Sequence, residues 1–173
     1  MDRDILRQFY RRYSREIYLY LYSLCKSRET AEDLMQEVFL KALLSLPDQN
    51  ENLRAWLYKV ARNACFNELR NRKREVEMDP AAGADVYAAE AVKKNQDSLS
   101  DILILNEQKK MLYEAMLKLP DRQREILELF YFSEMSMKQI AEIMKLTPQN
   151  VRVLAYRAKK QLREYMEVKE YEL

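Results

Sequence analysis

The chain of 173 residues is 48% hydrophobic and 34% charged with a net charge of +2, and it has one glycine, four prolines and no histidine. So few turn residues exclude a sheet-rich fold, and the lack of histidine, Cys-x-x-Cys pairs and glycine-rich loops argues against an enzyme, a metal site or a nucleotide cofactor. No apolar run reaches membrane-span length and no signal-peptide core begins the chain, so we expect a cytoplasmic, all-α protein.

The N-terminal part of the chain predicts two amphipathic helices. Apolar residues recur at helical spacing in the first: Leu6, Phe9, Tyr13, Ile17, Tyr20, Leu21 and Leu24. The alternation at Tyr18–Tyr22 would suit a strand, but the flanking period is helical, so we predict that the helix continues through it. Ser27 or Thr30 would cap the second helix, which Pro47 ends. Its predicted apolar face is formed by Ala31, Leu34, Met35, Val38, Phe39, Ala42 and Leu43.

A third, strongly cationic helix is predicted from about Leu53 to about Arg74, after a polar loop at 48–52 that offers several N-caps. Between Arg54 and Arg74 the sequence has seven Lys/Arg and a single acid. The inward face of this helix is predicted to be formed by Leu53, Trp56, Leu57, Val60, Ala61, Ala64 and Leu69. Because Trp56 lies on that face, it is interpreted as a core anchor and not as a stacking residue.

An acidic linker is predicted at 75–100. Residues 75–101 contain seven Asp/Glu and two Lys/Arg, and the same stretch holds Pro80 and the only glycine, Gly83. Such a composition is typical of a flexible connection. We therefore predict two small helical domains, 1–74 and 101–173.

The stretch 136–163 predicts two helices joined by a tight turn. Ser136 and Gln139 fit a capping box for the first helix, while Thr147 followed by Pro148 is a favourable start for the second. The apolar stripe of the second helix is formed by Val151, Leu154, Ala155, Ala158 and Leu162. From 145 to 163 there are six Lys/Arg and no acid, which suits a DNA major groove. A basic helix alone could be a solvated surface, but two of them indicate a nucleic acid contacted at two places.

Three segments resemble parts of bacterial sigma-70 factors, and their spacing is similar to that of the extracytoplasmic-function group, which keeps only two domains. Residues 31–43, AEDLMQEVFLKAL, resemble the segment that binds core RNA polymerase. Residues 52–74, NLRAWLYKVARNACFNELRNRKR, resemble the segment that melts promoters and reads the −10 element. The C-terminal segment from LPDRQREILELFYF to VRVLAYRAKKQL resembles the −35-reading domain. The resemblance implies a region 2 helical bundle at 1–74 and a region 4 helix-turn-helix domain at 101–173.

The resemblance also implies roles for individual residues. Those that match the polymerase-binding surface are Asp33, Leu34, Gln36, Glu37 and Phe39. Those that match the face toward the −10 element, where a base would be flipped out near the loop at 48–52, are Lys59, Arg62, Asn63, Asn67 and Arg70. Those that match the groove-facing part of the −35 helix are Gln149, Asn150, Arg152, Val153, Tyr156, Arg157 and Lys160. Leu34 and Phe39 remain open to the alternative that they are core residues of their own domain.

The function implied by the resemblance is that of an alternative sigma factor, which directs core RNA polymerase to promoters and performs no chemistry itself. The implied partners are the clamp helices of the largest polymerase subunit, the flap of the second subunit, promoter DNA and an anti-sigma factor, either free or anchored at the inner membrane face. No small-molecule substrate, cofactor or metal is implied. The alternatives are a stand-alone helix-turn-helix regulator that binds duplex operators and a helical adaptor whose basic faces are solvated.

Some positions depart from the pattern of the family. Lys145 stands where the helix-turn-helix turn often has glycine, and a positive φ would strain a lysine by about 1 kcal/mol. Asn67 stands where the family often has aspartate, and Val153 and Leu154 replace more polar residues of the recognition helix. These departures concern the promoter sequence that is read, not the function.

Overall fold

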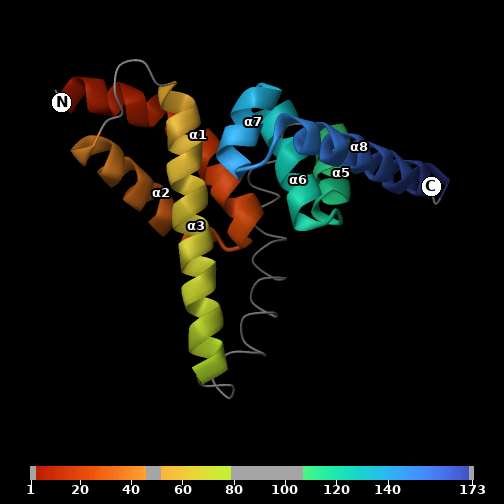
Figure 1. The fold of residues 1–173 in the computed structure, drawn as a ribbon, viewed down its shortest axis with the longest axis horizontal. Coiled ribbons are helices and arrows are strands. Elements are labelled where there is room, and N and C mark those ends of the chain that lie inside the picture. Colours follow the sequence, from red (N-terminus) through yellow and green to blue (C-terminus); the bar gives the residue numbers. More distant parts are fainter. Residues whose placement is uncertain (1–2, 46–51, 79–106, 172–173) are drawn as a thin grey trace. The chain divides into compact units, whose positions relative to one another are not determined.

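The computed structural model describes residues 3–45, 52–78 and 107–171, and in these ranges the chain forms helices with short connections and no strand (Figure 1). The chain divides into two units, Met1–Ser98 and Leu99–Leu173. The predicted all-α fold is therefore confirmed for the described residues. Most of the predicted linker, and the loop at 48–52 except its last residue, lie outside them.

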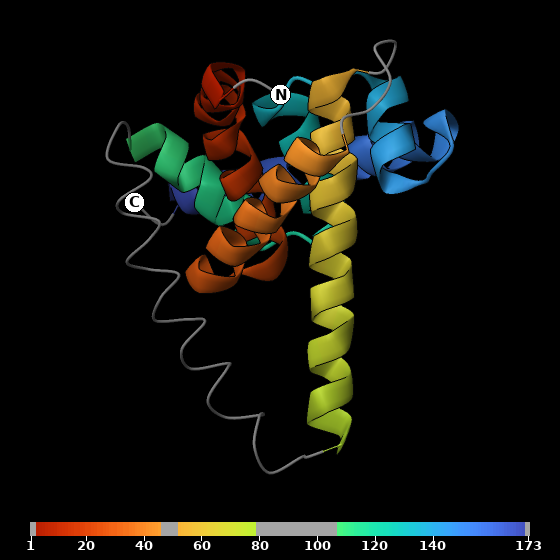
Figure 2. The same ribbon diagram turned by 90° about the vertical axis from the view of Figure 1, so that its left-hand side faces the viewer.

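The first unit is built from three helices, α1 (Arg3–Cys25), α2 (Arg28–Leu44) and α3 (Leu53–Met78). Helix α1 packs against both α2 and α3 (Figures 1 and 2). The core includes Ile17, Tyr20 and Leu21 of α1, and the Tyr20 ring lies 4.9 Å from the Tyr58 ring of α3. The alternating stretch at Tyr18–Tyr22 is helical, as predicted. Because α1 packs on two partner helices, more than one of its faces is buried, and this explains the alternation.

The turn between α1 and α2 is held by local hydrogen bonds. Lys26 has a φ of 55°, and the Ser27 side chain caps α2 by accepting a 3.4 Å hydrogen bond from the Thr30 amide. At the end of α1, the Cys25 thiol donates to the Ser27 carbonyl at 3.4 Å. A hydrogen bond with the buried Cys65 thiol of α3 lowers the pKa of Cys25, and both cysteines are free.

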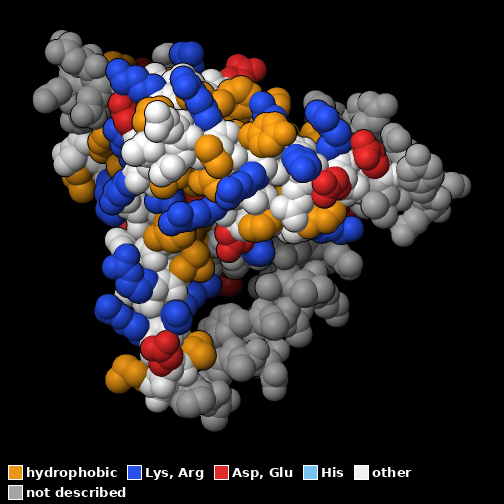
Figure 3. Space-filling view, turned by 45° about the vertical axis from the view of Figure 1, so that its right-hand side comes forward, with side chains coloured by type: hydrophobic (Ala, Val, Ile, Leu, Met, Phe, Trp, Pro, Cys, Tyr) orange, Lys and Arg blue, Asp and Glu red, His pale blue; other side chains and the backbone are white. Residues whose placement is uncertain are grey.

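Helix α3 is longer than predicted. Asn52 caps its start, because its side-chain oxygen accepts from the amides of Arg54 and Ala55 at 3.1 and 3.3 Å. The helix ends at Met78, four residues beyond the predicted Arg74. Residues 75–78 are exposed, and the sequence has no helix breaker between Arg74 and Pro80. Nothing in the sequence therefore ends the helix at Arg74. The C-terminal half of α3 extends past α1 and α2 (Figures 1 and 2). Lys and Arg side chains gather along this half (Figure 3).

The second unit contains α5 (Glu107–Leu117), α6 (Asp121–Leu127), η1 (Glu128–Phe132), α7 (Met137–Met144) and α8 (Pro148–Tyr171). Helix α8 packs against α5, α6 and α7. One part of the core joins Met116, Leu119, Leu127 and Ala158, with Leu112, Leu162 and Tyr165 packed against it. The segment η1 is a single π-helical turn that continues α6, and no sequence pattern predicted it.

The helix-turn-helix of the second unit follows the predicted capping. The Ser136 hydroxyl accepts from the Gln139 amide at 3.1 Å, and the Gln139 side chain accepts from the Ser136 amide at 3.0 Å. The Thr147 hydroxyl accepts from the Asn150 amide at 3.2 Å, and Pro148 is the first residue of α8. Lys145, between the two helices, has φ 55° and ψ 46°, so the turn keeps its left-handed geometry without a glycine.

Candidate polymerase and nucleic-acid interfaces

The residues matched to polymerase binding divide between two sides of α2. Asp33, Gln36 and Glu37 are exposed, whereas Leu34 and Phe39 are only 4% and 6% exposed. The Phe39 ring packs edge-on to the rings of Phe9 and Tyr10 at 5.7 and 4.9 Å. Leu34 and Phe39 therefore belong to the core of the first unit, and their contact with polymerase stays a prediction.

The exposed side of α2 also carries apolar residues that the sequence analysis did not select. Leu40 and Leu44 are 56% and 75% exposed. They continue the line of Asp33 and Gln36 at intervals of three and four residues, so all four lie on one side of the helix. We call these four residues the α2 face. Helical spacing counted from Asp33 would have found its leucines.

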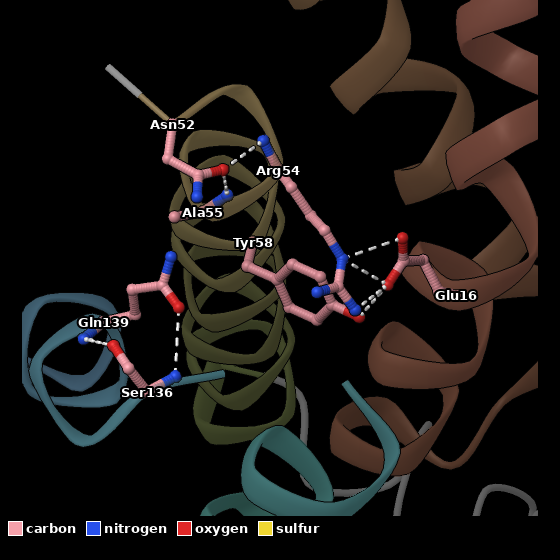
Figure 4. Close-up of polar contacts among 7 residues, drawn as sticks. All are labelled: Glu16, Asn52, Arg54, Ala55, Tyr58, Ser136 and Gln139. Carbon is pink, nitrogen blue, oxygen red and sulfur yellow. Dashed lines mark hydrogen bonds and ion pairs between the residues drawn. The ribbon is translucent and has the colours of Figure 1, made fainter. Parts of the chain in front are cut away.

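One half-buried arginine of α3 binds another helix of the same unit. Arg54 binds the Glu16 carboxylate of α1 through Nε and Nη2, at distances of 2.7 to 3.1 Å (Figure 4). The Tyr58 hydroxyl donates to the same carboxylate at 2.9 Å. The Glu16 carboxylate raises the pKa of the Arg54 guanidinium, which stays protonated. This cluster joins α1 to α3 and removes Arg54 from the cations available to a nucleic acid.

A second arginine of α3 joins that helix to the start of α2. Arg72 donates through Nη2 to the hydroxyl of buried Thr30 at 2.6 Å and through Nε to Glu68 at 3.0 Å. The cationic character of α3 is therefore divided. Some of its charge fixes the helix in the unit, and the remainder lies along its surface.

The residues matched to −10 recognition form one line along α3, which we call the α3 stripe. Asn63, Asn67 and Arg70 are exposed, and Lys59 and Arg62 are half-buried. The line also includes Phe66, which is 36% exposed and lies in the middle of it. The Arg62 guanidinium carbon is 4.4 Å from the centre of the Phe66 ring. Phe66 is not among the residues predicted from the sequence, although its spacing from Lys59 and Arg62 places it on their side of the helix.

The residues matched to −35 recognition lie together on the exposed side of α8. All seven are exposed: Gln149, Asn150, Arg152, Val153, Tyr156, Arg157 and Lys160. The opposite side is buried at Val151, Ala155 and Ala158, as the apolar stripe predicted. Lys159 is directed elsewhere, because its ammonium lies 4.9 and 5.5 Å from the ring centres of Phe130 and Tyr131.

The described residues also bear on other kinds of site. In the part of the chain that the structure describes, no three His, Cys, Asp or Glu side chains are grouped so that they could hold a metal ion. No described helix is long and apolar enough to cross a membrane.

Comparison with known proteins assigns the chain to a family. Residues 9–75 match the family model for sigma-70 region 2, and residues 109–162 match that for sigma-70 region 4. The RNA polymerase sigma factor YlaC of Bacillus subtilis is 31% identical over 173 residues, covering 95% of this chain and 93% of YlaC. The ECF RNA polymerase sigma factor SigM of Bacillus subtilis is 29% identical over 157 residues, 90% and 91% of the two chains. The chain belongs to the ECF group of sigma-70 factors.

The fold of this ECF sigma factor is also that of solved relatives. The sigma factor RpoE of Bartonella quintana, solved with the anti-sigma factor NepR, aligns with a TM-score of 0.73 at 22% identity, over 94% of this chain and 96% of that one. CnrH, solved with the cytosolic domain of CnrY, aligns with a TM-score of 0.64 at 17% identity, over 96% and 90%. The region 2 match contains the α2 face up to Leu44 and the whole α3 stripe, and the region 4 match contains all seven exposed residues of α8.

Proposed function

We propose that this ECF sigma factor binds core RNA polymerase through α2, holds the unpaired −10 strand on the α3 stripe and reads the −35 duplex with the exposed side of α8. The observation that carries the proposal is the presence of two exposed helix surfaces, one in each unit, that both combine cations with amide side chains. Cations neutralise phosphates, and amides hydrogen-bond to base edges. The polymerase, and not this protein, forms the phosphodiester bonds.

The α2 face fits a partner made of helices. It offers a carboxylate and an amide at Asp33 and Gln36, followed by the exposed leucines Leu40 and Leu44. Apolar side chains beside polar ones on one helix suit the groove between two partner helices, such as the clamp helices of the largest subunit. The exposed Glu37 is held by Lys41 at 2.8 Å at the edge of this surface. A contact of the second unit with the flap of the second polymerase subunit completes the assembly.

The two DNA-contacting surfaces differ in the form of DNA that they fit. Gln149 and Asn150 lie at the start of α8, where a helix that enters the major groove reads base edges. Arg152 and Arg157, farther along the same side, can reach phosphates. On α3, the amides of Asn63 and Asn67 can bond to the edge of a base taken out of the duplex.

We propose that an anti-sigma factor controls this protein. The support is that RpoE of Bartonella quintana was solved with NepR and CnrH with the cytosolic domain of CnrY. An anti-sigma factor that covers the α2 face would compete with polymerase. The protein then acts in the cytoplasm, and an anchored anti-sigma factor would hold it at the inner membrane face until release.

The test is transcription with reconstituted holoenzyme. The full chain is added to core RNA polymerase, fragmented genomic DNA of the source organism is transcribed, and the 5′ ends of the transcripts are sequenced. Starts that share two upstream elements, and that disappear without the full chain, are expected. An Asp33→Ala/Gln36→Ala variant should lose both the transcripts and co-purification with core polymerase.

The matched control removes the same two side-chain types from α1. Asp4→Ala/Gln8→Ala changes an exposed acid and an exposed amide one turn apart, and it should transcribe like the wild type. If the purified chain bound duplex DNA tightly and specifically without polymerase, and gave no promoter-specific starts with it, the protein would instead be a stand-alone helix-turn-helix regulator.

A further inference from the structure

Phe66 is an aromatic side chain in polar, cationic surroundings on the α3 stripe. Of the exposed residues of that helix, all of which the structure describes, it is the one aromatic. Arg62 lies one turn before it and Arg70 one turn after it, while Asn63 and Asn67 flank it. An isolated exposed phenylalanine is ordinary, but one placed between guanidinium and amide groups has the composition of a single-strand binding surface.

The core of the first unit does not account for the position of Phe66. The buried side of α3 toward α1 and α2 includes Leu57, Ala61, Ala64 and Cys65. Phe66 is 36% exposed, and the side-chain contact that distinguishes it is with the Arg62 guanidinium at 4.4 Å. A guanidinium over an aromatic ring is attracted to the face of the ring and keeps both groups in place. The Arg62 contact thus favours one orientation of the Phe66 ring on the helix surface.

We propose that Phe66, with Arg62 over its ring, is a stacking site for one base of the unpaired non-template strand, an inference that rests on the proposed function of the α3 stripe. A base in duplex DNA is stacked on both sides and cannot reach a protein ring, whereas an unpaired base exposes its face. The base stacks on the Phe66–Arg62 pair, its edge is within reach of Asn63 or Asn67, and Arg70 neutralises a phosphate. Phe66 therefore stabilises the open strand without contacting the closed duplex.

The neighbours of Phe66 favour a base over an apolar protein partner. A protein-docking surface has a cluster of apolar side chains at its centre, and the exposed neighbours of Phe66 on the stripe are Asn63, Asn67 and Arg70. Amides and guanidinium groups pair with the edges and phosphates of a nucleotide whose face rests on the ring.

The experiment compares holoenzymes that contain Phe66→Ala, Phe66→Leu and Phe66→Trp. The DNA probes come from a promoter found in the transcription experiment above: a duplex that holds only the −35 element, and a fork whose −10 non-template strand is unpaired. Leucine keeps an apolar side chain of similar size but has no π face, so it is the matched control for packing. Stacking predicts that alanine and leucine both weaken fork binding by about 5- to 150-fold, the equivalent of about 1–3 kcal/mol, and that tryptophan retains it.

Binding to the −35 duplex should be unchanged in all three variants, and their thermal unfolding by circular dichroism should show that each is folded. Wild-type fork binding by the leucine or the alanine variant would overturn the inference, and so would an equal loss on the −35 duplex. A wild-type holoenzyme that starts no promoter-specific transcripts would refute the proposed function itself. Failure of the proposed function is thus distinguishable from failure of the stacking inference.

Discussion

Helices α3 and α8 are both strongly cationic, but some of the cations of α3 bind other groups of the same unit, whereas the residues of α8 matched to DNA reading are exposed. In α3, Arg54 and Arg72 are held by Glu16, Glu68 and Thr30 of the same unit. In α8, every residue matched to DNA reading is exposed. Equal density of charge along two helices therefore does not mean equal capacity to neutralise phosphates.

The two helices differ more clearly in the side chains that lie between their cations. The α3 stripe has an aromatic ring at Phe66 and amides on either side of it, in the middle of a long helix. The reading side of α8 begins with its amides at Gln149 and Asn150, in the first turn after Pro148. A ring is useful where base faces are open, and a helix start is useful in a groove. This difference supports the proposal that α3 binds unpaired DNA and α8 binds duplex DNA.

The largest effect should come from the amides, and it should separate the two helices by the form of DNA. Asn63→Ala/Asn67→Ala should weaken binding of holoenzyme to the −10 fork on the order of 100-fold and leave the −35 duplex unaffected, because each lost base contact costs about 1–3 kcal/mol. Gln149→Ala/Asn150→Ala should do the reverse. Fluorescence anisotropy with the two DNA probes measures the affinity of each variant. If either double variant lost binding to both probes, the assignment of the two helices to different forms of DNA would be wrong.

The next effect concerns the internal arginine. Glu16→Gln should lower the unfolding free energy of the first unit by about 2 kcal/mol, because Arg54 and Tyr58 lose a charged acceptor in a site where both ion-pair side chains are under a third exposed. Trp56, the only tryptophan of the chain, lies in this unit, so its fluorescence in a urea titration reports the change.

Glu32→Gln is the matched control for that substitution. It removes an ion pair with Arg28 whose side chains are 58% and 49% exposed, and it should change the unfolding free energy by no more than about 0.5 kcal/mol. Equal effects of the two variants would mean that the Arg54 cluster is no more structural than a surface pair, and α3 would then have one more cation for DNA.

How far the sequence predicts this molecule depends on the distance between interacting residues. The capping box at Ser136 and Gln139 joins residues three apart, and it is found as predicted. Glu16, which binds Arg54, and Thr30, which binds Arg72, lie 38 and 42 residues away in the sequence, so a count of charges along α3 cannot identify which arginines bind other helices of the unit. Local patterns predict helices and caps, whereas tertiary packing decides which charges are free for function.

The same limit explains the differences at the candidate sites. Leu34 and Phe39 match a family motif, but the motif does not state which side of α2 packs on α1, and the aromatic contacts of Phe39 bury it. Trp56 was the only aromatic of this helix considered for stacking, and Phe66 was therefore overlooked. Trp56 is half-buried and is not among the buried core residues of α3, so its predicted role as a core anchor is not confirmed. The exposed side of α8 was easier to predict, since its buried stripe is regular and no acid interrupts its cations.

A smaller effect should distinguish the two ends of α8. Arg152→Ala should lower the slope of log affinity against log salt for the −35 duplex by about one and weaken binding several-fold, as expected for one lost phosphate contact. Arg163→Ala, also exposed but about 16 Å farther along the helix, should change neither. A salt titration of holoenzyme on that duplex measures both slopes, and an equal change for Arg163 would spread the duplex contact over the whole helix.

The smallest effect concerns the turn that sets α8 against α7. Lys145→Gly should raise the unfolding free energy of the second unit by about 1 kcal/mol, because a glycine adopts φ 55° without the clash of a Cβ atom. Lys160→Gly, the same change inside α8, should lower it by about 1 kcal/mol. Hydrogen exchange of buried α8 amides measures both. Opposite signs of the two changes would mean that Lys145 keeps a strained turn in the second unit. Equal losses of stability would mean that the Lys145 side chain stabilises the turn.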